Sequence, residues 1–247
     1  MRIACLSAES ADICARVGAW GDVVAVTAFA DQSGLDPKPV VSGFSSGDAA
    51  RILSHSPDLV LTFSDVQAEL TASLIRAGAF VLATNQRSLR ETASAIRLVA
   101  RAAGRGEAGE ELAESFEREL AALRRSPARR PRVYFEEWPD PPISGIGWVG
   151  ELIELTGGED IFAGRRARSA KERTVRDEEV LADAPDFILA SWCGKPVDLA
   201  SLRRRFSETP AGRADRIMEL PSADFLQPGP RLIEGARILH RLLSSFA

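Results

Sequence analysis

Short apolar runs alternate with helical patterns along most of the 247-residue chain, and this alternation constrains the fold more than any other feature. The candidate strands of the first half are Arg2–Leu6, Val23–Phe29, Leu59–Phe63 and Phe80–Thr84. Those of the second half are Arg132–Trp138, Phe187–Ser191 and Arg216–Leu220. Strands that alternate with helices predict a mostly parallel sheet with helices on both faces. We therefore expect an α/β protein.

A short stretch of similar sequence occurs in both halves of the chain. Ser56–Leu61 reads SPDLVL and Ala184–Leu189 reads APDFIL, and each follows a short predicted helix. A long helix is predicted between the halves, over Glu107–Arg125, and we expect Gly104, Gly106 and Gly109 to interrupt or loosen the helical region. These features predict two Rossmann-like lobes, 1–86 and 131–247, joined by a helical region at 87–130. A ligand cleft is expected between the lobes, at the carboxyl ends of the strands.

Composition excludes several classes of protein. The formal charge is -4, whereas a nucleic-acid-binding face needs clustered positive charge. No apolar run approaches the roughly 20 residues that span a bilayer. The three cysteines are odd in number and lack C-x-x-C spacing, so we expect neither a disulfide framework nor a zinc site. Cys5 and Cys14 are interpreted as small core residues.

The chain carries no motif of catalysis. No nucleophile elbow, phosphate-binding loop, zinc-protease motif or complete dinucleotide fingerprint occurs. The two histidines, His55 and His240, lie in predicted helices without a partner motif. We therefore expect a binding protein and not an enzyme, with no metal site and no intrinsic cofactor.

Aromatic and small polar residues follow the predicted strands. They are Phe29, Asp31, Gln32, Phe63, Asp65, Trp138, Trp192, Lys195, Asp224, Phe225 and Gln227. The carboxyl ends of parallel strands share one edge, so these side chains are expected to line one rim. Flat faces beside hydrogen-bonding groups suit a large ring-containing ligand. The alternative is that the aromatic residues plug the interface between the lobes.

The stretch FEEWPDPPISGIGWVGELIELTGG, from Phe135 to Gly158, places two tryptophans around prolines and glycines. We interpret it as a stiff loop that leaves a strand, followed by a helix. Trp138 and Trp148 are then expected to flank the cleft instead of the core, with Ser144 orienting polar groups of the ligand.

At these residues the chain resembles the cobalamin-binding members of the periplasmic substrate-binding proteins of ABC transporters, which belong to a superfamily of metal, cobalamin and siderophore receptors. The resemblance covers nearly the whole chain. The segments that carry it are Leu6–Ser10, Ile52–Leu61, Pro142–Gly145 with Gly157–Phe162, and Gln227–Pro230. It implies two lobes joined by a rigid helix, and a ligand such as cobalamin, another corrinoid, heme or a ferric siderophore.

The resemblance also implies roles for individual residues. Phe44, Phe63 and Phe225 correspond to the aromatic residues of the family's cobalamin pocket. Family members dock on the membrane subunit of the transporter through one glutamate per lobe. Glu178 occupies that position in the second lobe, whereas Ala50 occupies it in the first. An alanine cannot make the charge-assisted bond to an arginine, so docking is in doubt.

The resemblance implies a periplasmic monomer that binds a small molecule and no nucleic acid. The sequence begins directly with a predicted strand and shows no leader. Together with Ala50, this leaves an alternative: a cytoplasmic protein or enzyme that handles a tetrapyrrole or another cofactor without a transporter.

Overall fold

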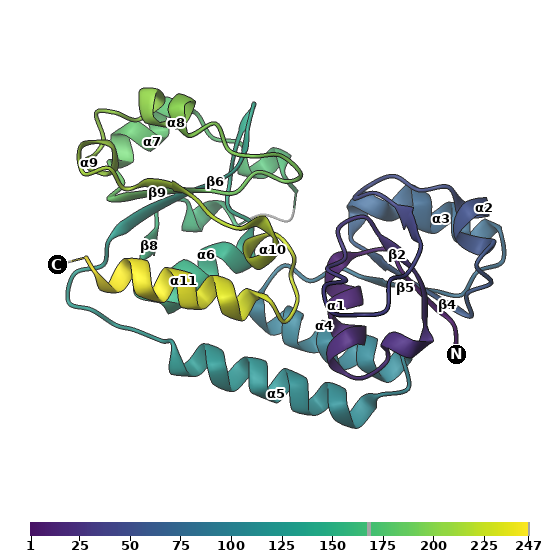
Figure 1. Ribbon diagram of the computed structural model, residues 1–247. Helices are drawn as coiled ribbons and strands as arrows, with labels where there is room; N and C mark the ends of the chain where they lie inside the picture. Colours follow the sequence, from purple (N-terminus) through teal and green to yellow (C-terminus); the bar gives the residue numbers. More distant parts are fainter. Residues whose placement is uncertain (167–168, 247) are drawn as a thin grey trace. The chain divides into compact units, whose positions relative to one another are not determined.

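The computed structural model describes residues 1–166 and 169–246 (Figure 1). The chain forms two units, Met1–Gln86 with Arg90–Glu117 and Arg87–Leu89 with Arg118–Ala247. Each unit contains one sheet and the helices that pack on it, so the two-lobed α/β fold predicted from the sequence is confirmed. The helical region that we placed between the lobes is divided between the two units.

The sheet of the first unit is entirely parallel. Its order is β3-β2-β1-β4-β5, with β1 at Ile3–Cys5, β2 at Val23–Thr27, β3 at Val40–Ser42, β4 at Leu59–Phe63 and β5 at Val81–Thr84. The strand order reverses between β1 and β4, and such switch points are where open α/β sheets bind ligands. The sequence did not predict β3, because its two valines directly follow Pro37 and Pro39, and prolines usually mark loops.

Helices cover both faces of this sheet. They are α1 (Ala8–Arg16), α2 (Ala49–Leu53), α3 (Ala68–Arg76) and α4 (Leu89–Ala102), with the 3₁₀ turns η1 (Trp20–Asp22) and η2 (Asp65–Gln67). Figure 1 shows α1 and α4 on one face and α2 and α3 on the other. Leu70 and Leu74 of α3 pack with Ile52 and Val60 in one buried cluster. Their four-residue spacing places both side chains on the face of α3 that meets the sheet.

The sheet of the second unit is mostly parallel and is arranged around one central strand. It contains β6 (Arg132–Pro139), β7 (Pro142–Ser144), β8 (Glu159–Asp160), β9 (Phe187–Ala190) and β10 (Ile217–Glu219). The order is β10-β9-β6-β7, and β8 also pairs with β6. Only β7 is antiparallel, in a hairpin that pairs Trp138 with Ile143. The proline-rich stretch that we expected to be a loop is therefore a hairpin.

Helices also cover both faces of the second sheet. They are α6 (Gly147–Leu155), α7 (Asp177–Asp183), α8 (Leu199–Arg205), α9 (Pro210–Arg213), α10 (Ser222–Phe225) and α11 (Leu232–Ser244), with 3₁₀ turns η3 (Ala163–Arg165) and η4 (Lys171–Arg173). Figure 1 shows α7, α8 and α9 above the sheet and α6, α10 and α11 below it. Tyr134, Ile188 and Phe206 belong to a buried cluster on the side of α7 and α8.

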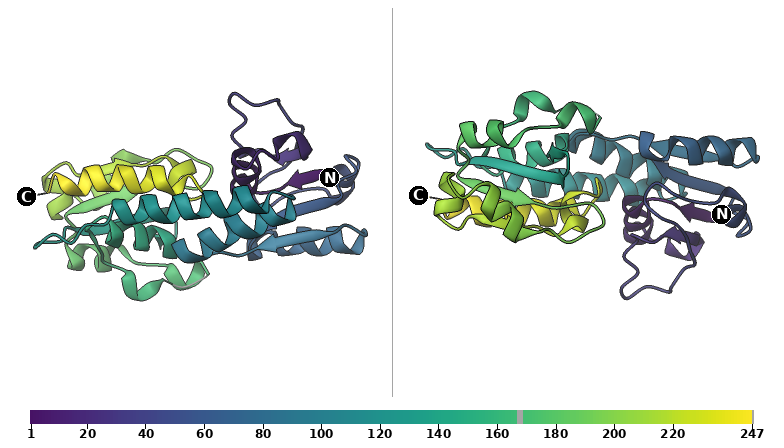
Figure 2. Two further views of the ribbon diagram at one scale, coloured as in Figure 1. Left: turned by 90° about the horizontal axis from the view of Figure 1, so that it is seen from below. Right: turned by 90° about the horizontal axis from the view of Figure 1, so that it is seen from above.

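The long predicted helix is present as α5 (Gly106–Ala122), which carries the chain from the first unit into the second. Ala113, Phe116 and Leu120 are its buried apolar residues. In the second unit, α11 runs beside the end of α5 (Figure 2), and Nδ1 of His240 lies 3.0 Å from the carbonyl oxygen of Leu123. Within the described part of the chain, no helix is long and apolar enough to cross a membrane.

The three glycines of the helical region have different roles. Gly104 ends α4 with φ +71° and Gly106 begins α5. Gly109 lies inside α5, where a Cβ atom would overlap the Cβ of Ala100 on α4. Gly109 therefore does not interrupt the helix, and its missing side chain permits the close approach of α4 and α5.

Gly109→Ala should lower the free energy of unfolding by about 1–3 kcal/mol, because overpacking outweighs the better helix propensity of alanine. Urea unfolding monitored by circular dichroism measures the change. Gly106→Ala is the matched control on the same helix, since only the flexible side chain of Arg101 approaches that position. Equal stability of the two variants would contradict the close helix contact.

Candidate functional site

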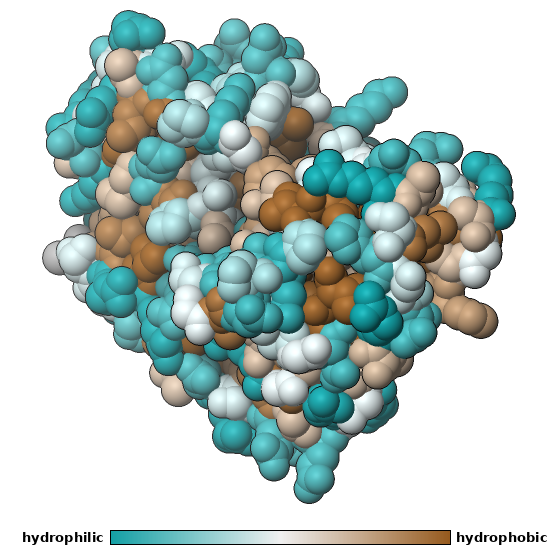
Figure 3. Space-filling model, turned by 45° about the vertical axis from the view of Figure 1, so that its right-hand side comes forward, coloured by the Kyte–Doolittle hydropathy of each residue, from teal (hydrophilic) through white to brown (hydrophobic). Residues whose placement is uncertain are grey.

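Exposed aromatic residues follow two strands of the first unit. The surface in Figure 3 carries apolar patches among hydrophilic side chains, and the exposed apolar residues include Phe29 (40%) and Phe44 (43%). Phe29 lies two residues beyond β2, and Phe44 lies two residues beyond β3. Their rings meet edge to face with centroids 6.2 Å apart. The pair presents ring surface at the carboxyl edge of the sheet; the sequence placed Phe29 at a strand end, and the family resemblance implied a role for Phe44.

A buried glutamine, which sequence reasoning missed, fixes the backbone around the end of β4. Gln67 is 3% exposed and accepts a hydrogen bond from the Phe63 amide at 2.9 Å. Its amide nitrogen lies 2.8 Å from the carbonyl oxygens of Leu6 and Phe44 and donates to them. One side chain therefore ties the ends of β1 and β4 to the segment that carries Phe44. A glutamine four residues after the last strand residue is the only sequence signal, and it is too common to interpret alone.

The other predicted residues of the first unit have separate positions. Phe63 is nearly buried at the end of β4, whereas Asp31 and Asp65 are exposed. The side chain of Gln32 closes its own loop: it accepts from the Lys38 amide at 2.5 Å and donates to the Lys38 carbonyl at 3.3 Å. These contacts assign Gln32 a structural role in the loop.

In the second unit, Lys195 lies against two tryptophans. Its Nζ atom is 4.0 Å from the centroid of the Trp138 ring and 5.2 Å from that of Trp192. Trp138 is half-buried at the end of β6, and Trp192 follows β9 and is 7% exposed. A cation over the face of an indole is attracted by the negative face of the ring. The structure thus brings together three residues that the sequence predicted for this edge.

A buried carboxylate orients Trp192. The indole Nε1 of Trp192 donates to Glu136 at 3.2 Å, and the hydroxyl of Tyr134 donates to the same carboxylate at 3.1 Å. Arg205 completes the network with ion pairs to Glu136 at 2.9 Å and to Asp177 at 2.6 Å. Burial raises the pKa of Glu136, and the guanidinium of Arg205 opposes that rise. This network could not be predicted from the sequence, because Glu136, Asp177 and Arg205 are distant along the chain.

Two predicted ligand residues lie in the core instead of at the rim. Trp148 is 2% exposed and donates its indole N–H to the carbonyl of Phe225 at 2.7 Å, and Phe225 is fully buried against Phe135 with centroids 5.9 Å apart. The expectation that Trp148 flanks the cleft is therefore wrong. The prediction that Phe225 offers an accessible ring to the ligand is also wrong, because this ring is fully buried. Helix α6 is apolar on nearly all sides, which is typical of a buried helix.

Three polar residues predicted for the site have mainly structural contacts. The hydroxyl of Ser144, 3% exposed, donates to the carbonyl of Arg173 at 3.1 Å. Asp224 is 8% exposed and pairs with Arg231 at 3.1 Å. Gln227 is half-buried after α10.

The two positions considered for docking on a transporter are both exposed. Glu178 lies in the first turn of α7, and Ala50 lies on α2.

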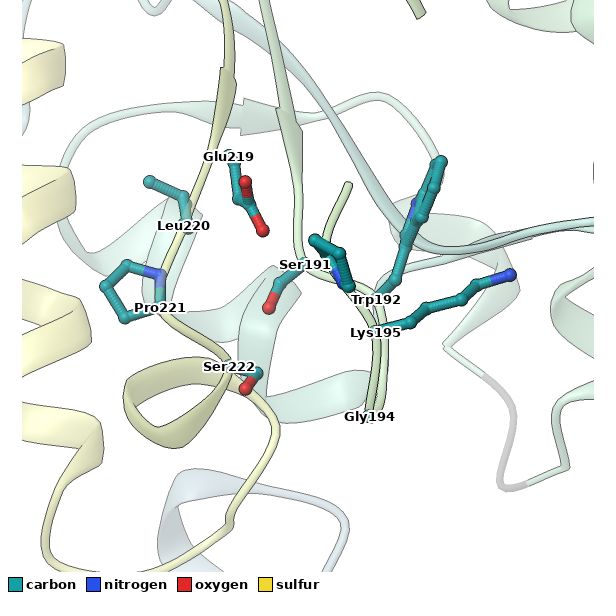
Figure 4. Close-up of a pocket in the computed structure, with 9 residues that line it drawn as sticks. Ser191, Trp192, Gly194, Lys195, Glu219, Leu220, Pro221 and Ser222 are labelled. Atoms are coloured by element: carbon teal, nitrogen blue, oxygen red, sulfur yellow. The ribbon is translucent and has the colours of Figure 1, made fainter. Parts of the chain in front are cut away.

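A hollow of about 540 Å³ opens between the ends of β9 and β10 (Figure 4). Its lining residues are Ser191, Trp192, Gly194, Lys195, Pro196, Glu219, Leu220, Pro221 and Ser222. The carboxylate of Glu219 and the hydroxyls of Ser191 and Ser222 extend into it in the close-up. Among residues 1–166 and 169–246, no group of three or more His, Cys, Asp or Glu side chains is arranged to hold a metal ion. The edge can therefore offer aromatic faces and hydrogen bonds to a ligand.

The pKa of Glu136 gives a test of the network. Since burial raises this pKa, the stability that the group contributes is fully present below the pKa of the unfolded chain and is lost as pH rises through the folded pKa. The free energy of unfolding of the wild type minus that of Glu136→Gln should therefore fall between pH 4 and pH 7 in urea titrations. Glu208→Gln, at an exposed carboxylate, serves as the control for the loss of one negative charge. If the free energy of unfolding of the wild type minus that of Glu136→Gln instead rises with pH, the raised pKa of Glu136 is contradicted.

Comparisons with known proteins agree with this architecture. The vitamin B12-binding protein of Vibrio parahaemolyticus serotype O3:K6 (strain RIMD 2210633) is 25% identical over 240 residues, which cover 94% of this chain and 85% of that protein. The structure is similar to that of the periplasmic heme-binding protein RhuT from Roseiflexus sp. RS-1 in apo form, with a TM-score of 0.82, 27% identity and coverage of 99% of this chain and 97% of that one.

A second solved structure supports the fold. The periplasmic vitamin B12 binding protein BtuF of Vibrio cholerae matches with a TM-score of 0.76 and 21% identity, over 98% of this chain and 96% of that one. The family model described as periplasmic binding protein matches residues 3–223. The chain therefore belongs to the periplasmic binding protein family.

Proposed function

We propose that this protein binds a corrinoid such as cobalamin through the aromatic residues at the carboxyl edges of its sheets and delivers it to an ABC importer from the periplasm. The observation that carries the proposal is the pair of accessible phenylalanines, Phe29 and Phe44, at the carboxyl edge of the first sheet. In the second unit, the half-buried ring of Trp138 provides the corresponding aromatic surface, and Lys195 lies against this ring and against that of the buried Trp192. Accessible rings beyond strand ends suit a large flat ligand. The membership of the binding-protein family supports a role in transport.

The available metal ligands favour a corrinoid over heme. Proteins hold heme iron through His, Cys, Met or Tyr. Tyr134 is fully buried and bonded to Glu136, His240 contacts the end of α5, and His55 follows α2. Cys193 is the strand-end candidate, but burial raises the pKa of its thiol and so disfavours the thiolate that binds metals. Cobalamin needs no protein ligand, because its own nucleotide base can occupy an axial position of the cobalt.

Removal of either exposed ring should weaken binding of cobalamin. We expect Phe29→Ala and Phe44→Ala each to raise Kd about tenfold, a loss of about 1.4 kcal/mol, which is typical of an aromatic stacking contact. Isothermal titration with cobalamin, cobinamide, heme and a ferric siderophore measures Kd and ranks the ligands. Phe80→Ala is the control, because Phe80 is 79% exposed but precedes β5, at the opposite edge of the sheet. Absence of cobalamin binding at millimolar concentration would remove the assignment.

Docking on a transporter is proposed to depend on the second unit. Glu178 offers a carboxylate on α7, whereas Ala50 on α2 offers none. Asp48 is close to Ala50, but its Oδ1 accepts a hydrogen bond from the Ala50 amide at 2.9 Å and so caps α2. The first unit therefore lacks the charge that the family resemblance implies there, and we expect weak docking.

Two substitutions test this asymmetry. Ala50→Glu should strengthen binding to a cobalamin-type transporter in nanodiscs about fivefold, and Glu178→Ala should weaken it by a similar factor, since each changes one charged contact of about 1 kcal/mol. Glu208→Ala controls for net charge. No effect of either change in surface plasmon resonance would instead favour the second candidate function, a cofactor-binding protein uncoupled from transport. That alternative rests on Ala50, because its side chain has no carboxylate for docking on a transporter.

A further inference from the structure

The hollow between β9 and β10 contains a buried hydroxyl that lacks a partner. Ser191 is 1% exposed, and its Oγ forms no hydrogen bond with any residue of the described ranges 1–166 and 169–246. Leaving a buried polar atom unpaired has a cost in free energy, and such atoms are satisfied in most proteins by a protein group, water or ligand. Figure 4 shows this hydroxyl extending into the hollow. Ser191 is therefore suited to a polar ligand group.

The charged group that extends into the hollow is negative. Oε1 of Glu219 accepts a hydrogen bond from the Val197 amide at 3.1 Å, which holds the carboxylate in place. In the close-up, this carboxylate and the hydroxyls of Ser191 and Ser222 converge on the open space. The ammonium of Lys195 points away from them, and its Nζ lies over the rings of Trp138 and Trp192. The hollow can thus accept hydrogen bonds through Glu219 and both accept and donate through the serines.

We propose that this hollow receives a carboxamide arm of the ring ligand and that Glu219 excludes arms that end in a carboxylate. A carboxamide donates through its NH₂ group and accepts through its oxygen, so it can bond Glu219 and Ser191 together. A carboxylate only accepts, and its charge would be repelled by Glu219. This inference rests on the proposed function. Corrins carry amide arms, whereas heme carries propionates, so the hollow would add to the selectivity for a corrinoid.

Cobalamin monocarboxylic acids test the proposal, because in each isomer one amide arm has been hydrolysed to an acid. For the wild type at pH 7.5, we expect one isomer to bind about tenfold more weakly than cobalamin, since one repelled charge is worth about that factor. The other isomers should bind like cobalamin. Glu219→Gln should reduce the deficit of that isomer to less than about twofold, because Gln keeps the acceptor for the Val197 amide and removes the charge. Isothermal titration gives every Kd.

Two variants separate charge from shape. Glu208→Gln makes the same change in net charge on the same unit and should leave the deficit intact. Lys195→Met should weaken the binding of cobalamin and of its monocarboxylic acids by the same factor. The ratio of their Kd values should therefore stay unchanged. If cobalamin binds and all isomers bind equally, or if Glu219→Gln leaves the deficit, this inference is overturned while the proposed function stands. If cobalamin itself does not bind the wild type, both are overturned.

Discussion

Parallel strand pairing is the constraint on which the rest of the structure depends. β1 pairs in parallel with β2 and β4 in the first unit, and β6 pairs in parallel with β9 in the second. Parallel strands bring their carboxyl ends to one edge, where the following loops lie beside each other. Each sheet therefore gathers residues from distant parts of the sequence at a single edge. The aromatic pair of the first unit and the Lys195 cluster of the second are both consequences of that pairing.

Buried polar side chains fix these edges. Gln67 joins three backbone segments in the first unit, and Glu136 with Arg205 holds Trp192 in the second. Such networks are costly if they are left incomplete, and satisfied networks restrict the side chains to one arrangement. A preformed aromatic surface lowers the entropy lost when a ligand binds. The two networks thus connect the stability of each unit to the geometry of its edge.

The sequence predicted the α/β class, most strands and the long helix, because hydrophobic periodicity reports directly on burial. It did not predict β3 or the β6–β7 hairpin, since prolines, which usually mark loops, precede the first and lie within the second. Trp148 was assigned to the rim because of the glycines around it, whereas the apolar residues on nearly all sides of α6 indicate burial. The contacts of Gln67 and Glu136 depend on tertiary structure that one sequence does not reveal.

A crystal structure of the protein grown with cobalamin would show whether the ligand lies on the aromatic residues at the sheet edges. We expect density for the corrin ring against Phe29 and Phe44 of the first unit and against the Trp138–Lys195–Trp192 cluster of the second, with an amide arm beside Ser191 and Glu219. Density for cobalamin elsewhere on the surface, with both aromatic edges unoccupied, would contradict this prediction.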